Sequence, residues 1–257
     1  RGHHFDLCVI DEAAQSTEPG CWLPLRYSQR LVLAGDHCQL PPTVLAKAAA
    51  ANGLGISMME RLLQSADHAA TLARQLDLQY RMHQQIMSFS SQTFYGGTLL
   101  ADATVAHHLL CELPGVVESE LTTTPVTFID TAGADYHEAV EADGESRFNE
   151  GEAQLVQHKI AQLCEAGLPL TQIAVISPYS AQVRLLRERL KPQLEQGLEI
   201  GSIDGFQGRE NEAVIISLVR SNGDGEIGFL ADTRRMNVAL TRARRKLIVI
   251  GDRATIA

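Results

Sequence analysis

Short apolar runs rich in β-branched residues alternate along this chain with longer segments whose apolar residues recur at helical spacing. The alternation predicts an α/β fold in which a parallel sheet is covered by helices on both faces. We expect strands at Leu7–Ile10, Arg30–Ala34, Val126–Ile129, Ile173–Ser177, Ala213–Leu218 and Leu247–Ile250. We expect helices at Ile56–Gln64, Gln84–Thr93, Glu152–Ala166, Ala181–Leu190 and Arg234–Ala243. In such sheets, functional residues gather at the carboxyl ends of the strands.

The length of the chain and the absence of long apolar runs limit the class of protein. With 257 residues, the chain is long enough for one large α/β domain, or for one domain and part of another. It enters the first expected strand soon after Arg1, so we expect a natural N-terminal part to precede it. No apolar run approaches the roughly 18 to 20 residues of a membrane span, and no signal segment is visible. We therefore expect a cytoplasmic protein without membrane contact.

Cysteines and histidines show no pattern typical of a metal site. The five cysteines are odd in number and widely spaced, and no C-x-x-C pair occurs. We therefore expect neither a disulfide framework nor a zinc or iron–sulfur site. The pairs His3-His4 and His107-His108 are adjacent, so their side chains point in different directions on a regular element, and we do not expect them to bind a metal.

Charge is unevenly distributed along the chain. The net charge of −9 argues against a protein that coats nucleic acid by bulk attraction, although a local basic groove remains compatible with it. Acid is concentrated between residues 138 and 152, whereas the basic stretch Arg234–Lys246 contains no acid. The acidic stretch Ala132–Asn149 is poor in apolar residues, which predicts a solvated insertion.

Two of the expected strands end in side chains that suit nucleotide chemistry. The first is followed by Asp11 and Glu12, which could hold Mg²⁺ and polarise a water molecule. The alternative is a helix N-terminus that accommodates negative charge. The second leads through Gly35 to Gln39, whose amide could sense a γ-phosphate. A plain surface turn would explain the glycine and the prolines that follow, but it would not require the glutamine.

Two later segments combine residues that could contact a nucleotide. Tyr80 and Arg81 place an aromatic ring beside a guanidinium, which could stack on a base and bind a phosphate. The alternative is a packed tyrosine and a surface arginine. The loop from Ile200 to Glu210 contains three glycines, whose N–H groups could line an anion site. A glycine-rich hairpin is the competing interpretation, but it would not require the polar side chains of this loop.

Two basic segments could contact nucleic acid. Arg234–Arg245 carries five arginines, and Arg235 and Arg242, seven residues apart, would share one face of the expected helix. Solvated charge at a helix end is the ordinary explanation. Pro178-Tyr179 follows an expected strand and opens an arginine-bearing helix, so the tyrosine ring could stack on a base. A buried, hydrogen-bonded tyrosine is the more common situation.

Five segments, in this order, resemble motifs II to VI of superfamily 1 helicases: Asp11-Glu12-Ala13-Ala14-Gln15, Gly35-Asp36-His37-Cys38-Gln39-Leu40-Pro41, Gln79-Tyr80-Arg81-Met82, Ser202-Ile203-Asp204-Gly205-Phe206-Gln207-Gly208-Arg209-Glu210 and Asn237-Val238-Ala239-Leu240-Thr241-Arg242-Ala243. The chain is most similar to the 5′-to-3′ group that includes the nonsense-mediated-decay and immunoglobulin mu-binding helicases. The resemblance implies RecA-like, P-loop NTPase folds. Residues 1–70 would end a first RecA-like domain, and residues 71–257 would form the second, with the acidic insertion near 132–149.

The resemblance also implies catalytic roles. Asp11 would hold the Mg²⁺ of ATP, Glu12 would orient or deprotonate the hydrolytic water, and Gln39 would couple the γ-phosphate to movement. Arg81 and Arg242 would be arginine fingers, which reach from the second domain to phosphates bound on the first.

Further residues would bind the nucleotide base, its sugar and the nucleic acid. Tyr80 would lie against the adenine, Glu210 would contact the ribose, and the Gly208 N–H would face the γ-phosphate. A single strand of DNA or RNA would cross both domains and meet Ser177, Pro178, Tyr179, Ser202 and Asp204.

Two departures from the family pattern have consequences. Cys38 stands where many relatives have lysine, so no cation is expected there. No segment matches G-x-x-x-x-G-K-[ST], the loop that wraps the β- and γ-phosphates. An arginine finger accelerates hydrolysis about 10³- to 10⁵-fold only when the phosphate is held in place. We therefore expect the 257-residue chain alone to hydrolyse ATP negligibly, and the intact protein, a monomer with an N-terminal motor domain in cis, to be an ATPase.

The reaction implied for the intact protein is ATP hydrolysis coupled to translocation on, and unwinding of, nucleic acid. One alternative is a translocase that strips proteins from single strands and unwinds little. Another is a catalytically silent nucleic-acid-binding module, which the presence of Glu12, Gln39 and both fingers disfavours. A nuclease would need a second carboxylate–lysine cluster, and the sequence shows none.

Overall fold

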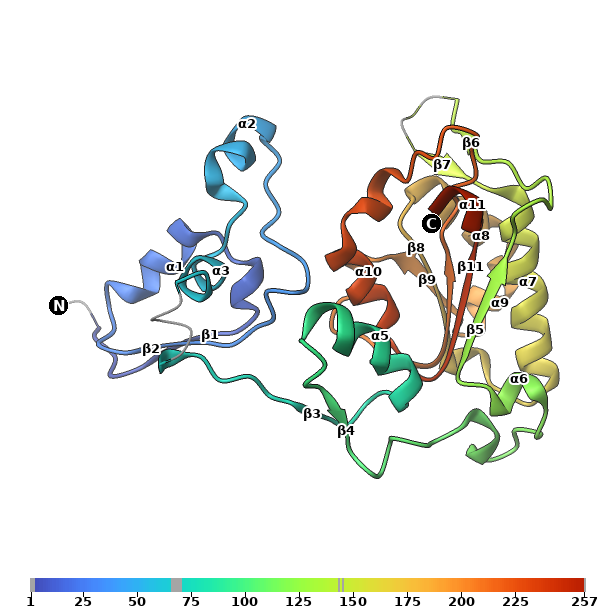
Figure 1. Cartoon of the computed structure of the whole chain (residues 1–257), viewed down its shortest axis with the longest axis horizontal. Coiled ribbons are helices and arrows are strands. Elements are labelled where there is room, and N and C mark those ends of the chain that lie inside the picture. Colours follow the sequence, from blue (N-terminus) through green and yellow to red (C-terminus); the bar gives the residue numbers. More distant parts are fainter. Residues whose placement is uncertain (1–2, 66–70, 143, 145, 257) are drawn as a thin grey trace. The chain divides into compact units, whose positions relative to one another are not determined.

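The chain is described by a computed structural model that covers residues 3–65, 71–142, 144 and 146–256 (Figure 1). It divides into two compact units, Arg1–Gln75 (unit 1) and Leu76–Ala257 (unit 2). The resemblance to helicases predicts a domain boundary near residue 70. None of the described helices combines the length and the apolar character that a membrane span requires.

Unit 1 is built on two short parallel strands. β1 (Cys8–Ile10) pairs with β2 (Leu31–Leu33), with Val9 opposite Val32. The short helices of the unit are η1 (Ala13–Gln15), α1 (Glu18–Leu25), α2 (Lys47–Ala49), η2 (Ala50–Leu54) and α3 (Met58–Leu63). Ser57 begins α3 by accepting a hydrogen bond from the backbone N–H of Glu60 at 3.0 Å. Both strands and the helix expected in this region are present.

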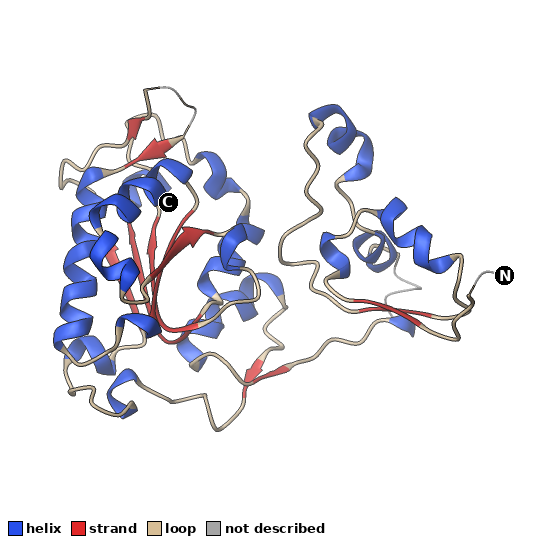
Figure 2. Ribbon diagram, turned by 180° about the vertical axis from the view of Figure 1, so that it is seen from behind, coloured by secondary structure: helices blue, strands red, loops and turns tan. Residues whose placement is uncertain are grey.

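Unit 2 contains a five-stranded parallel sheet in the order β5-β11-β10-β8-β9. Its strands are drawn in red in Figure 2. Its strands are β5 (Val126–Asp130), β8 (Ile173–Ser177), β9 (Glu199–Ser202), β10 (Asn211–Ser217) and β11 (Ala243–Gly251). Every residue of β8 is buried, which is typical of a parallel strand covered on both faces and explains its uninterrupted apolar sequence.

Helices cover both faces of this sheet, so the expected α/β fold is confirmed. The helices are α5 (Gln84–Phe94), α6 (Glu120–Thr123), α7 (Glu150–Glu165), α8 (Ser180–Arg189), α9 (Lys191–Glu195), α10 (Thr233–Leu240) and α11 (Arg253–Ile256). The core on one face joins α7 and α8 to the central strands through residues such as Leu163, Leu186 and Ile215. In Figure 1, α5 and α10 lie on the opposite side from α7.

Shorter elements of unit 2 connect these layers. Two small sheets pair β3 (Leu78–Gln79) with β4 (Leu100–Ala101), and β6 (Ala139–Val140) with β7 (Arg147–Phe148). Single turns of 3-10 helix are η3 (Leu110–Glu112), η4 (Leu170–Gln172), η5 (Asp204–Phe206) and η6 (Gly228–Ala231). η5 lies in the glycine-rich segment after β9, where functional residues are expected, and η6 lies between β10 and α10.

The end of α10 corrects one expectation. A helix was expected over Arg234–Ala243, but α10 ends at Leu240. Thr241 closes it by donating its hydroxyl to backbone carbonyls of the preceding turn, and β11 begins soon after. Arg242 therefore lies outside the helix, and it does not share a helical face with Arg235.

The acidic stretch 132–149 is not solvated throughout, which corrects a second expectation. It contains the hairpin β6–β7. The Glu138 side chain is only 8% exposed beside Arg220, and Asn149 is fully buried at the start of α7. Composition alone suggested solvation, whereas pairing with a distant cation compensates for burial of the carboxylate.

Candidate functional site

Two carboxylates follow β1 in unit 1. Asp11 and Glu12 are exposed, and Glu12 has a left-handed backbone with φ of 50°, which costs energy for a residue other than glycine. Asp11 accepts a hydrogen bond from the N–H of Glu12 at 2.9 Å, and Glu12 accepts one from the side-chain amide of Gln15 at 2.7 Å. These contacts fix the turn that presents both carboxylates at the carboxyl end of the strand.

The segment after β2 lies against this turn within unit 1. The N–H of Ala13 donates to the carbonyl of Ala34 at 2.8 Å. A Cβ atom at Gly35 would lie 2.9 Å from the nitrogen of Ala13, so glycine permits the close approach. The amide of Gln39 donates to Asp36 at 2.8 Å. Unit 1 thus brings two of the predicted nucleotide segments side by side.

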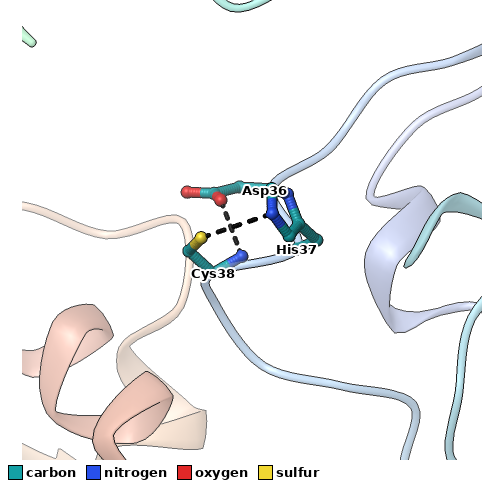
Figure 3. Close-up of side chains that lie close together, drawn as sticks. All are labelled: Asp36, His37 and Cys38. Carbon is teal, nitrogen blue, oxygen red and sulfur yellow. Dashed lines mark hydrogen bonds between the residues drawn. The ribbon is translucent and has the colours of Figure 1, made fainter. Parts of the chain in front are cut away.

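The loop between Gly35 and Gln39 contains three possible metal ligands (Figure 3). A carboxylate oxygen of Asp36, a ring nitrogen of His37 and the sulfur of Cys38 lie within 4.8 Å of one another. The sulfur lies 3.6 Å from Nε2 of His37, and Asp36 accepts the N–H of Cys38 at 2.9 Å. These donors could hold a divalent cation. Because the residues are consecutive, however, the turn alone accounts for their proximity.

In unit 2, three predicted segments converge on Arg81. Its Nε donates to Glu210 in an ion pair, and its Nη1 donates to the carbonyl of Thr241 at 3.3 Å. Arg244 lies 3.6 Å from the same Glu210 carboxylate and 3.3 Å from that of Glu212. Residues far apart in the sequence therefore form one charged surface, as a shared ligand site requires.

Histidines anchor the segment that carries Arg81. The backbone N–H of His83 donates to the carbonyl of Arg244 at 2.8 Å, and Nε2 of His108 approaches the same carbonyl at 2.7 Å. Burial lowers the pKa of both imidazoles, which favours their neutral forms. The start of α5 is thereby fixed to β11, which positions the guanidinium of Arg81.

The second predicted finger, Arg242, is buried in this structure. Only 3% of the residue is exposed. Its guanidinium donates to the carbonyl of Val238 at 2.9 Å, to Thr241 Oγ1 at 3.0 Å and to the carbonyl of Arg209 at 3.3 Å. Arg242 therefore links the end of α10 to the glycine-rich loop, and binding a phosphate would require its side chain to turn.

Two predicted nucleotide contacts remain accessible. Tyr80 is 63% exposed, so its ring is free to meet a base and is not packed under α5. Gly208 has φ of 74°, in the left-handed region that favours glycine, and lies in an exposed turn. Both residues lie in unit 2, in the same segments as Arg81 and Glu210.

The residues that are predicted to contact the nucleic-acid strand differ in accessibility. Ser177 and Tyr179 are buried, at 1% and 2% exposure, and the tyrosine hydroxyl accepts a hydrogen bond from Arg220 at 3.4 Å. The alternative of a buried, hydrogen-bonded tyrosine therefore describes this structure, and the ring offers no free face to a base. Asp204 is exposed and pairs with Arg235 at 3.5 Å, while Ser202 and Pro178 are partly exposed.

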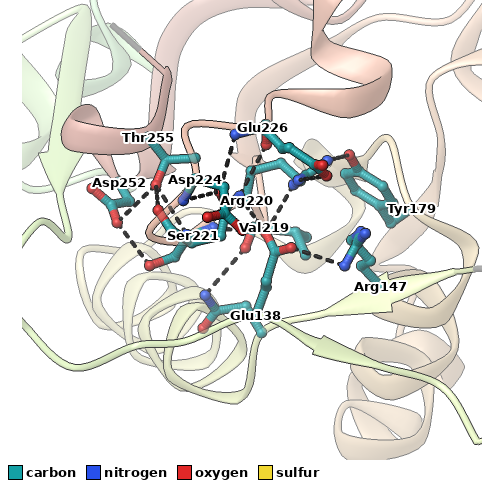
Figure 4. Close-up of polar contacts among 12 residues, drawn as sticks. Glu138, Arg147, Tyr179, Val219, Arg220, Ser221, Asp224, Glu226, Asp252 and Thr255 are labelled. Carbon is teal, nitrogen blue, oxygen red and sulfur yellow. Dashed lines mark hydrogen bonds and ion pairs between the residues drawn. The ribbon is translucent and has the colours of Figure 1, made fainter.

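A buried ion cluster behind Tyr179 was missed by sequence reasoning (Figure 4). Arg220, 3% exposed, pairs with Glu138 at 2.8 Å, and the second oxygen of Glu138 pairs with Arg147 at 2.9 Å. Arg220 also lies 3.5 Å from Glu226. The only sequence signal was a lone arginine directly after an apolar strand, and its partners lie far away in the sequence. The cluster fixes the backbone at the carboxyl end of β10.

A second buried network, also missed, surrounds Glu152 at the start of α7. Asn149 caps the helix by accepting the N–H of Glu152 at 3.0 Å, a spacing that the sequence could have revealed. The Glu152 carboxylate accepts hydrogen bonds from the hydroxyl of Ser217 at 2.6 Å and from the N–H of Val219. Burial raises the pKa of Glu152 to about 7, although these hydrogen bonds act in the opposite direction.

We expect Glu152 to make the stability of unit 2 depend on pH. Between the ordinary pKa of 4.5 and the folded value of about 7, the folded chain binds more protons than the unfolded chain. The free energy of unfolding should therefore fall as pH rises through this window, by about 3 kcal/mol from this group. Urea unfolding at several pH values measures this change in the free energy of unfolding. Glu152→Gln should remove this part of the slope, whereas Glu165→Gln, at the exposed end of α7, should keep it. Equal slopes in both variants would contradict the assignment.

Two family models with the same description match most of the chain. Residues 54–254 match the sequence model of a family described as an AAA domain, and residues 1–47 match a second model with the same description. The chain is 51% identical to the DNA-binding protein SMUBP-2 of Mesocricetus auratus over 99% of its length. It is 46% identical to the DNA polymerase alpha-associated DNA helicase A of Schizosaccharomyces pombe over 100% of its length.

A more distant relative is an uncharacterized ATP-dependent helicase of Methanocaldococcus jannaschii, 40% identical over 98% of the chain. The chain spans 25%, 38% and 36% of the lengths of these three relatives, respectively. The similarity therefore covers nearly all of this chain and a minor part of each relative.

Proposed function

Because this chain belongs to the AAA-domain family, we propose that it is the C-terminal part of an ATP-dependent helicase that couples ATP hydrolysis to translocation on, and unwinding of, nucleic acid. The family match and the helicase names of the relatives support superfamily 1. Within it, the 5′-to-3′ group of the nonsense-mediated-decay and mu-binding helicases is the finer proposal. The observation that carries the proposal is the convergence of Arg81, Glu210 and Thr241 in unit 2.

We propose that unit 1 contributes the magnesium side of the ATP site. Asp11 would hold Mg²⁺, because an exposed carboxylate at a strand end offers the hard oxygen ligands that this ion prefers. The ion would neutralise charge on the phosphates. Glu12 would orient the water molecule or accept its proton, with Gln15 fixing the carboxylate. Gln39, beside this turn, would respond to the γ-phosphate.

Unit 2 would contribute the cations. In the structure, the side chains of Arg81 and Glu210 form an ion pair. ATP would separate them in our proposal: Glu210 would turn to the ribose, and Arg81 to a phosphate. Arg242 would exchange its backbone acceptors for phosphate oxygens. Tyr80 would cover the adenine, and the Gly208 N–H would face the γ-phosphate. Closure on ATP and opening after hydrolysis would then move the bound strand.

The open face of unit 1 supports an additional motor segment in cis. Phe5 and Leu7 lie in the segment that leads into β1, Val9 lies in β1, and Val32 lies opposite Val9 in the sheet. These residues are 59%, 49%, 59% and 47% exposed, respectively. An apolar sheet face of this kind requires cover. We propose that the N-terminal part of the first RecA-like domain, with its phosphate-binding loop, covers it in the full-length protein, which we expect to be monomeric and cytoplasmic.

ATP turnover with and without single-stranded DNA or RNA tests the proposal. The full-length protein should hydrolyse ATP faster when a strand is added and should unwind a duplex with a 5′ overhang. The 257-residue chain alone should show negligible turnover, because the phosphate-binding loop is absent from its sequence. If single-stranded nucleic acid stimulated ATP turnover by the chain alone, the proposal that turnover needs a phosphate-binding loop outside this chain would be refuted. Turnover without unwinding would instead identify a translocase that remodels protein–nucleic-acid complexes.

A further inference from the structure

Phe229, in η6, is a large aromatic residue that remains exposed. It is 59% exposed, while its ring packs against the buried ring of Tyr179 with centroids 5.6 Å apart and planes inclined by 51°. This arrangement is typical of a favourable aromatic pair. One ring therefore supports the other, and Phe229 is the one that faces outward.

The support beneath Phe229 is rigid. The preceding Gly228 has φ of 56°, and a Cβ atom there would lie 2.1 Å from Arg220 Nη1 and 2.9 Å from the hydroxyl of Tyr179. The chain can pass so closely only because this residue is glycine. Arg220 is in turn fixed by its buried ion pair with Glu138 (Figure 4). The exposed ring of Phe229 is thus supported by a buried polar cluster. Its side chain should therefore lose little conformational freedom when a ligand binds.

Phe229 is connected to both segments that are expected to meet nucleic acid. It contacts Tyr179, which follows β8. The helix after η6 is joined to the segment after β9, since Arg235 pairs with Asp204 at 3.5 Å and with Asp232 at 3.4 Å. Arg234 and Arg235 follow Phe229 by five and six residues, and their side chains, 34% and 35% exposed, could contribute positive charge for phosphates.

We propose that Phe229 is the platform on which one base of the bound single strand stacks, in the place that the sequence assigned to the ring of Tyr179. This deepens the proposed function and rests on it. An exposed ring that is followed along the chain by two partly exposed arginines suits single-stranded nucleic acid, because every base has a π face and every nucleotide carries a phosphate. The contact would be tolerant of sequence, and Tyr179 would act by positioning Phe229.

Binding of a fluorescent oligothymidylate to the full-length protein, followed by anisotropy, tests the platform. Phe229→Ala should weaken binding about 5- to 150-fold, the range for one lost base stack. Phe229→Trp should bind like the wild type, and the oligonucleotide should quench its fluorescence more than it quenches that of the wild-type protein, because only the variant has an indole at this position. Phe128→Ala removes an aromatic residue of similar exposure, 46%, from β5 and should leave affinity unchanged.

Salt dependence separates stacking from charge. Because Phe229 contacts no phosphate in this proposal, Phe229→Ala should leave the slope of log affinity against log salt unchanged. In Phe229→Ala, half-maximal stimulation of ATP turnover should need a higher concentration of single-stranded nucleic acid, by the same factor as the affinity loss.

Three outcomes would overturn the platform and leave the helicase proposal standing: wild-type affinity in Phe229→Ala, an equal loss in Phe128→Ala, or an indole that the strand does not quench. An exposed ring that serves a protein partner would give the first of these. If the wild-type protein neither binds the oligonucleotide nor responds to it in ATP turnover, the proposed function itself fails.

Discussion

Replacing Arg81 by alanine in the full-length protein is expected to lower kcat for ATP hydrolysis by about 10³- to 10⁵-fold, the loss that follows removal of an arginine finger. The guanidinium is a planar fork of donors that matches phosphate oxygens in the transition state. The side chain is 34% exposed and contacts Glu210 and the carbonyl of Thr241 at the surface. Its truncation should therefore remove catalytic charge and leave the core intact.

Controls distinguish a finger from a structural ion pair. Arg81→Lys keeps the charge but loses the fork, so it should recover only part of the rate. Arg184→Ala breaks a comparable exposed pair, with Glu141 on the same unit, and should keep the wild-type kcat. Affinity for the single strand should survive in Arg81→Ala. If Arg81→Ala kept the wild-type kcat, Arg81 would serve only to pair with Glu210.

The second large effect concerns Glu12. Glu12→Gln in the full-length protein should reduce ATP turnover by about 10²- to 10⁴-fold, because an amide cannot accept the proton of the attacking water. Binding of Mg²⁺·ATP should persist, since Asp11 remains. The substitution preserves side-chain shape, and Gln15 can still donate to the amide oxygen that replaces Glu12 Oε2. Single-turnover hydrolysis and a separate nucleotide-binding titration measure the two properties.

Glu60→Gln, a carboxylate of α3 in the same unit, provides the matched control and should leave turnover unchanged. Loss of nucleotide affinity together with turnover in Glu12→Gln would place this residue in ground-state binding instead. Turnover that Glu12→Gln leaves unchanged would remove this residue from the chemistry. A full-length wild-type protein without any ATP turnover would instead be a catalytically silent nucleic-acid-binding module.

The fold was predictable where burial leaves a continuous signal. β8, β10 and β11 are covered on both faces, so each contains a continuous apolar run, Ile173–Ile176, Ala213–Ile216 and Leu247–Ile250 respectively. β9 was missed because Glu199-Ile200-Gly201-Ser202 contains one large apolar residue and a glycine. Its stability comes from pairing with β8 at the edge of the sheet, and such a long-range contact leaves no local pattern.

The candidate site was predictable where polar residues follow a strand within a few positions, as Asp11 follows β1 and Gln39 follows β2. Accessibility was not predictable, because it depends on partners from elsewhere in the chain. Tyr179 is buried by Arg220 and Phe229, which lie in a later segment. Glu138 was assigned to solvent because its neighbours in sequence are acidic, whereas its neighbours in space are Arg147 and Arg220.

The most direct measurement is a structure of the full-length protein with Mg²⁺, a nonhydrolysable ATP analogue and a single-stranded oligonucleotide. We expect the guanidinium groups of Arg81 and Arg242 within hydrogen-bond distance of the phosphates whose Mg²⁺ is held by Asp11. The Arg81–Glu210 pair should be broken. If the analogue instead binds beside Asp11 and Glu12 with both arginines directed away from it, the two units do not form one ATP site, and the proposed mechanism is wrong.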